Sequence, residues 1–248
     1  MTKKVKIRLD EAVLRADLSA NLQAAQALIL AGKVLVDGQR VDKVGTIIQA
    51  TSQVSLKGTK KYVSRAGEKL ESAILALGVK NEFKDRVVVD IGASTGGFTH
   101  CVLQFGASLV FAVEAGFNQF SAVLKDDPRV RLFEQTDIRD FIPPDNQAID
   151  WVVADVSFVS LVRLSDSILA LGGPKTRYLL LVKPQFELEK GEVPAGGVVL
   201  DEGLRAQAVK RVRDHFEGHG LSCLGQCDSA IMGRRGNLET FVLLARKG

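Results

Sequence analysis

The chain has 248 residues, 46% of them hydrophobic, and a net charge of +4, which suits one large and one small globular domain. Its longest apolar runs are shorter than the roughly 18 residues that span a bilayer, and its N-terminus, MTKKVKIRLDEAV, is charged where a signal peptide is apolar. Three cysteines are too few for a disulfide framework, so we expect reduced thiols, a cytoplasmic protein and no membrane partner.

The positive charge is concentrated in the first quarter of the chain. Residues 1–69 hold 13 Lys and Arg against 6 Asp and Glu, whereas residues 70–248 hold 20 against 23. A concentrated positive face is typical of proteins that bind polyanions. A solvated surface can have the same composition, so charge alone leaves both interpretations open.

Short helices and strands are predicted in this basic region. Apolar spacing indicates a helix from Leu9 to Leu14 and a second from Leu22 to Ile29, with Asn21 as its N-cap. Segment 33–41 contains Asp-Gly between apolar residues, which predicts a β-hairpin, and residues 53–56 add another short strand. Two helices beside a small sheet would present basic side chains to the phosphates of structured RNA.

The stretches RLDEAV and AQALILAGKVLVDGQRV resemble the RNA-binding domain first seen in ribosomal protein S-four. We place this α+β domain at residues 1–58 and a basic linker at residues 59–65. The side chains expected to contact RNA are Lys6, Arg8, Arg15, Lys33, Arg40, Lys43, Lys60, Lys61 and Arg65.

The larger domain, residues 66–248, has the pattern of a doubly wound α/β fold. A buried strand beginning at Val87 leads into the glycine-rich loop 92–97, and the next strand, 109–113, ends at Glu114. Ligands of such folds lie at the carboxyl ends of the strands, where an acid can bind ribose hydroxyls. The loop matches neither G-x-G-x-x-G nor a P-loop, so S-adenosylmethionine, which lacks phosphate, fits better than a nucleotide phosphate. The candidate cofactor-binding residues are Asp90, Gly92, Ala93, Ser94, Thr95, Gly96, Gly97, Phe98, Glu114, Asp137, Ile138 and Asp155.

Two later strands supply candidate catalytic groups at the same edge. Strand 150–155 ends in the carboxylate of Asp155, which opens the sequence DVSF, and strand 177–182 leads directly to Lys183. The Asn-Pro-Pro-Tyr or Asp-Pro-Pro-Tyr typical of amino-methylating enzymes is absent, which favours an unactivated hydroxyl as methyl acceptor. Such a hydroxyl needs a base, and a lysine can serve where burial and a neighbouring cation favour its neutral form. We expect Lys183 to be the base, and the candidate catalytic residues are Lys69, Asp155, Lys183 and Glu239.

The segments YVSRAGEKL, DIGASTGGFT, DVSF, KPQFE and GNLE together resemble the TlyA family of ribosomal RNA 2′-O-methyltransferases, whose catalytic domain is FtsJ-like. The resemblance implies a Rossmann-like class I methyltransferase sheet, S-adenosylmethionine as cofactor, and cytidine ribose in ribosomal RNA or ribosomal subunits as substrate. It also implies a Lys-Asp-Lys-Glu catalytic set at the four residues above and no metal. Glu114-Ala115 stands where the family commonly has Asp-Val, and Asn21-Leu22 where it usually has Ser-Arg.

Two alternatives remain at this point. The chain could be a ribosome-binding assembly factor with a vestigial cofactor site, or a membrane-active hemolysin, a label given to some members of the family. The second is the weaker, because the sequence contains neither a spanning helix nor a basic amphipathic surface helix.

Overall fold

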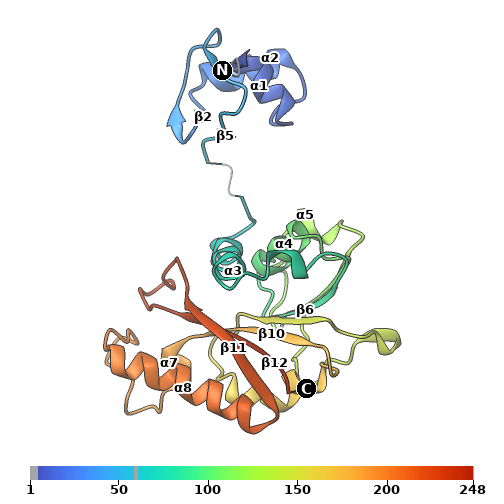
Figure 1. Ribbon diagram of the computed structural model, residues 1–248, viewed down its shortest axis with the longest axis vertical. Helices are drawn as coiled ribbons and strands as arrows, with labels where there is room; N and C mark the ends of the chain where they lie inside the picture. The colour runs from blue at the N-terminus through green and yellow to red at the C-terminus, as the bar shows by residue number, and fades with distance from the viewer. Residues whose placement is uncertain (1–4, 59–60, 248) are drawn as a thin grey trace. The chain divides into compact units, whose positions relative to one another are not determined.

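The computed structural model describes residues 5–58 and 61–247 (Figure 1). The chain forms two compact units, Met1–Lys60 and Lys61–Gly248. The boundary lies inside segment 59–65, whose role as a linker stays a prediction. Lys60, one of the expected RNA contacts, lies outside the described residues.

The first unit packs two helices against two small antiparallel sheets. One sheet pairs β1 (Lys6–Arg8) with β4 (Ile47–Gln49), and the other has the order β3-β2-β5. The remaining elements are α1 (Leu9–Arg15), α2 (Leu22–Leu30), β2 (Val34–Val36), β3 (Gln39–Arg40) and β5 (Val54–Leu56). Their core includes the buried side chains of Leu9, Val13, Ile29 and Val34.

Local sequence explains this small fold. The side chain of Asn21 accepts a hydrogen bond of 2.8 Å from the backbone N–H of Ala24, which confirms the predicted cap. Asp37 and Gly38 have φ angles of 50° and 80°, the left-handed pair that a two-residue hairpin turn requires. The pair β1 and β4 was not predicted, because three residues are too few to show a strand pattern.

The second unit is built on a seven-stranded sheet of order β11-β12-β10-β9-β6-β7-β8. Five neighbouring strands, from β10 to β8, run parallel, and β12 is antiparallel to both of its neighbours. The strands are β6 (Val87–Ile91), β7 (Leu109–Val113), β8 (Val130–Phe133), β9 (Trp151–Ala154), β10 (Arg177–Val182), β11 (Leu221–Asp228) and β12 (Thr240–Arg246). The predicted α/β class and Rossmann-like sheet are confirmed.

Helices cover both faces of this sheet (Figure 1). Alternate residues of β6 serve the two layers: Val88 packs with the layer of α3 and α4, and Val89 packs with that of α6 and α8. Burial on both faces explains the continuous apolar runs. The helices are α3 (Arg65–Ala76), α4 (Gly97–Gln104), α5 (Ala122–Lys125), α6 (Ser165–Ala170), α7 (Pro184–Glu187) and α8 (Glu202–Gly218), with 3-10 turns at Lys80–Glu82, Pro144–Asn146 and Val162–Leu164.

The start of α3 has no side-chain cap. Ser64 occupies the N-cap position, but its side chain makes no capping bond, and its buried Oγ has no partner among the described residues. That oxygen instead lies against Gly97, where an added Cβ would be 2.2 Å away. The absence of a side chain at Gly97 therefore allows the start of α3 to approach the start of α4 closely.

Within residues 5–58 and 61–247, no helix has both the length and the apolar character needed to cross a bilayer.

Candidate active site

The four predicted catalytic residues meet at the carboxyl edge of the parallel strands. Asp155 directly follows β9 and Lys183 directly follows β10. Glu239 directly precedes the antiparallel strand β12, and the register pairs Val182 with Thr240, so Lys183 and Glu239 occupy adjoining positions. Lys69 reaches this edge from the first turns of α3.

These residues form two ion pairs. Lys69 Nζ lies 2.6 Å from Glu239 Oε2, and Lys183 Nζ lies 2.5 Å from Asp155 Oδ1. The lysine side chains are each 9% exposed, and those of Glu239 and Asp155 are 4% and 17% exposed. Burying a lone charge is costly, so each lysine at this edge has a carboxylate partner. The structure thus brings the four predicted residues to the same edge of the sheet, while their catalytic role stays a prediction.

Ser157 is a contact of Lys183 that the sequence reasoning missed. Its Oγ lies 2.8 Å from Lys183 Nζ and accepts a hydrogen bond from it. A neutral lysine amine has two N–H donors and one lone pair. If the two donors bond to Asp155 and Ser157, the lone pair takes the remaining tetrahedral position and can receive a proton. The sequence feature that could have indicated this contact is the serine of DVSF, which lies two positions after the predicted carboxylate of Asp155.

The glycine loop passes close to this centre. Gly92 has a φ angle of 77°, and a Cβ added there would lie 2.9 Å from the carbonyl oxygen of Asp155. Gly96 has a φ angle of 89°, and Ser94 is left-handed as well. Only glycine fits the close approach at Gly92 without strain, which explains why the loop between β6 and α4 begins with this residue.

Glu114 connects the end of β7 to the same loop. Its Oε2 accepts a hydrogen bond of 2.8 Å from the N–H of Ser94, and its Oε1 accepts one of 2.6 Å from the N–H of Gly116. A carboxylate oxygen has two lone pairs, so each oxygen can accept one further donor such as a ribose hydroxyl. The longer side chain of glutamate thus spans the distance from strand to loop.

Asp90 adds an unpaired buried carboxyl to this edge. Its Oδ2 accepts bonds from the N–H and the Oγ1 of Thr99, at 2.9 and 2.6 Å, whereas Oδ1 has no partner in the described part of the chain. Burial raises the pKa of Asp90 to about 7, and the nearby charges of Asp155 and Glu114 push this pKa up as well. A buried carboxyl without a cation as partner suits a cationic ligand, and S-adenosylmethionine carries both a sulfonium and an ammonium.

Other predicted cofactor contacts are arranged less directly. The ring of Phe98 is buried against Phe241, with centroids 5.9 Å apart, so only its backbone borders the loop. The side chain of Ile138 is also in the core. Both oxygens of Asp137 accept bonds from Arg139, which holds the Asp137 pKa at about 2. These contacts stay predictions, and so do those of Ala93, Thr95 and Gly97 in the loop.

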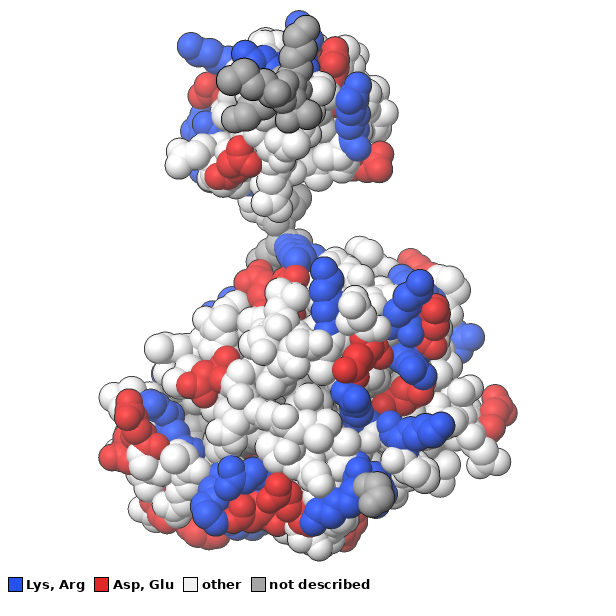
Figure 2. Space-filling view, in the orientation of Figure 1, with Lys and Arg blue, Asp and Glu red and all other residues white. Residues whose placement is uncertain are grey.

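The predicted RNA contacts of the first unit fall into two groups. Arg8 is paired with Asp10 at 2.8 Å and Arg40 with Asp42 at 3.4 Å. The exposed side chains that make no ion pair within the described residues are Lys6, Arg15, Lys33 and Lys43. Figure 2 shows Lys and Arg side chains at the surface of this unit.

At the start of the second unit, Lys61 is paired with Glu71, and Arg65 is exposed. In the same described ranges, no group of three or more His, Cys, Asp or Glu is arranged to hold a metal ion.

Comparison with known proteins agrees with this geometry. The family described as FtsJ-like methyltransferase matches residues 62–246, and the S4 domain matches residues 7–54. The chain is 37% identical to the 16S/23S rRNA (cytidine-2′-O)-methyltransferase TlyA of Mycobacterium tuberculosis, over 96% of this chain and 89% of that protein. It is 36% identical to Hemolysin A of Brachyspira hyodysenteriae, over 94% of this chain and 97% of that protein.

A solved structure from Streptococcus thermophilus also matches, with a TM-score of 0.72 at 34% identity, covering 98% of this chain and 90% of that one. The predicted kinship with TlyA proteins and the S-four-like domain are both confirmed. The chain belongs to the FtsJ-like methyltransferase family.

Proposed function

We propose that the protein transfers a methyl group from S-adenosylmethionine to the 2′-hydroxyl of a cytidine in ribosomal RNA, in the cytoplasm where ribosomes are found. The observation that carries the proposal is the buried amine of Lys183, held by Asp155 and Ser157 beside the glycine loop. Relatives with this activity in their names support the choice of nucleotide.

The cofactor supplies a methyl group on a positively charged sulfur when bound. The loop from Gly92, together with Glu114 and Asp90, would hold it at the carboxyl edge of β6 and β7. Lys183 Nζ would take the proton of the attacking ribose oxygen as the new C–O bond forms and the carbon–sulfur bond breaks. Asp155 would orient this amine.

The second ion pair has a separate part in this proposal. Lys69 and Glu239 neutralise each other at 2.6 Å, so the pair keeps the pocket polar without adding net charge next to Lys183. A fixed, preorganised pair can position a hydroxyl without reorganising during the reaction.

The basic first unit would bring the RNA to this edge. Its exposed cations are suited to phosphate contacts, and its S4 domain is shared with ribosomal proteins of the small subunit.

The proposal can be tested by incubating the protein with tritiated S-adenosylmethionine and unmethylated small subunits, large subunits or naked rRNA. We expect label at a single cytidine, in a linkage that resists alkali because the 2′-oxygen is blocked. Lys183→Ala should bind the cofactor but transfer no label. RNA binding without incorporation on any substrate would overturn the proposal in favour of an RNA-binding assembly factor.

A further inference from the structure

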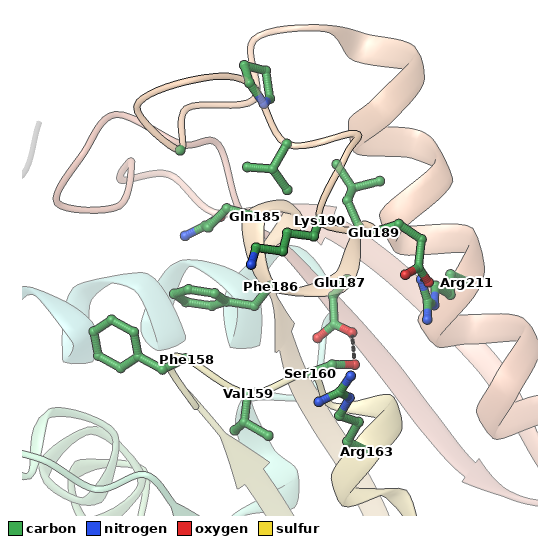
Figure 3. Close-up of a pocket in the computed structure, with 14 residues that line it drawn as sticks. Phe158, Val159, Ser160, Arg163, Gln185, Phe186, Glu187, Glu189, Lys190 and Arg211 are labelled. Carbon is green, nitrogen blue, oxygen red and sulfur yellow. Dashed lines mark hydrogen bonds and ion pairs between the residues drawn. The ribbon is translucent and has the colours of Figure 1, made fainter.

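A pocket of about 530 Å³ adjoins the candidate active site (Figure 3). Its walls come from residues 158–163 after β9, from α7, from the segment that follows α7 as far as Gly197, and from Arg211 of α8. Ser157, which bonds to Lys183, directly precedes the first wall, and Lys183 directly precedes α7. The pocket is therefore continuous along the chain with the proposed base.

The acidic groups in the pocket wall already have partners. Glu187 accepts a hydrogen bond from Ser160 Oγ at 2.5 Å, drawn in Figure 3, and another from the N–H of Leu161 at 2.8 Å. Glu189 pairs with Arg211 at 2.5 Å. The negative charges of the wall are thus engaged within the protein.

Two cations in the wall are free by contrast. Neither Arg163 nor Lys190, both exposed, takes part in an ion pair among residues 5–58 and 61–247. The buried Oε1 of Gln185, which also lines the pocket, has no hydrogen-bond partner in those ranges. Figure 3 shows Arg163 and Lys190 on different walls of the pocket. A pocket that combines two unpaired cations with carboxylates already engaged within the protein is complementary to an anion.

We propose that this pocket binds a phosphodiester of the RNA strand next to the reacting ribose, with Arg163 and Lys190 as its cations. The inference rests on the proposed function, because that function puts a ribose at Lys183 and every ribose in RNA is bonded to two phosphodiesters. Two cations on separate walls can contact one phosphate from two sides, and Arg163 can donate two parallel hydrogen bonds to its oxygens. This contact would orient the strand whose 2′-hydroxyl reacts.

The test measures binding of an unmethylated rRNA transcript to the full chain across a range of salt concentrations. We expect the double variant Arg163→Gln with Lys190→Gln to bind about tenfold more weakly near physiological salt. The slope of log affinity against log salt should become shallower by roughly 0.7, the contribution of one neutralised phosphate on a single strand. The charge-keeping double variant Arg163→Lys with Lys190→Arg should keep the slope.

The control is Lys175→Gln, an exposed lysine before β10 at the opposite edge of the sheet. It has no ion pair in the described part of the chain, so the same change of charge there should leave affinity and slope unchanged. A double variant that behaves like this control would overturn the inference. Failure of the proposed function gives a different result. The wild-type protein would then bind the transcript, with an affinity that falls as salt rises, but would transfer no methyl group to it.

Discussion

The basic groups of the two units are used in opposite ways. In the first unit, Lys33 and Lys43 are exposed and form no ion pair among the described residues. At the carboxyl edge of the second, Lys69 and Lys183 are buried and each is held by a carboxylate. An exposed free cation keeps its hydration and attracts a polyanion, whereas a buried paired amine has a fixed direction. In the proposed function, this contrast would separate RNA binding from chemistry within one chain.

Removal of Lys183 tests that separation most strongly. Lys183→Ala should lower kcat for methyl transfer by at least roughly a thousandfold, because a positioned base contributes about 10²–10⁴ and Asp155 is left unpaired. Affinity for S-adenosylmethionine and for rRNA, measured by calorimetry and filter binding, should change less than about threefold. The control Lys175→Ala, at the opposite edge, should retain full kcat. Near-normal turnover in Lys183→Ala would exclude it as the base.

Asp90 offers a second test, since it is buried at the same edge but has no cation as partner. Its carboxyl has a pKa of about 7 in the folded protein and about 3.9 in an unfolded chain, so folding takes up a proton between these values. The stabilisation from the protonated form is complete below about pH 4 and is lost as the pH rises through 7.

The variant Asp90→Asn lacks this titration. The unfolding free energy of the wild type relative to this variant should therefore fall by up to about 4 kcal/mol between pH 4 and pH 8. Urea titrations of the two proteins without cofactor, at several pH values, measure the difference. Parallel curves over this range would show that the carboxyl is not held protonated by burial.

The sequence predicted the structure best for strands that are buried on both faces of the sheet. Strand bounds at 109–113 and 177–182 agree with β7 and β10, because apolar runs enclosed on both faces leave no ambiguity of pattern. The carboxyl ends of parallel strands share one edge of the sheet, so the sequence alone predicts that Asp155 and Lys183 lie close together.

Contacts that depend on side-chain direction could not be predicted. The bond from Lys183 to Ser157 depends on the backbone path after β9, which no pattern in the sequence indicates. The pairing of Lys69 with Glu239 joins residues 170 positions apart, so the motif indicated the set but not its partners. The pocket at Arg163 and Lys190 arises from two loops with no shared pattern.

The exposed cations of the first unit give the third test. A quadruple variant, Lys6→Gln, Arg15→Gln, Lys33→Gln and Lys43→Gln, should weaken rRNA binding by roughly 30-fold near physiological salt and reduce the salt slope by about 0.7 for each residue that contacts phosphate. At saturating RNA its kcat should equal that of the wild type. The control variant carries Lys175→Gln and Lys84→Gln, two exposed lysines of the second unit, and should bind rRNA as the wild type does. A fall in kcat with unchanged affinity would contradict the division of roles.

Ser157 provides the smallest and most specific test, because it touches only the orientation of the buried amine. Ser157→Ala removes one of the two acceptors on Lys183 Nζ, and the loss of one hydrogen bond of this kind corresponds to about a tenfold lower kcat. Because Ser157 is exposed, thermal stability should be unchanged, and KM for RNA should stay within about twofold. Ser157→Thr restores the hydroxyl and should recover most of the rate, whereas a purely structural role would lower Tm and kcat together. Equal kcat in Ser157→Ala and wild type would mean that Asp155 alone directs the amine.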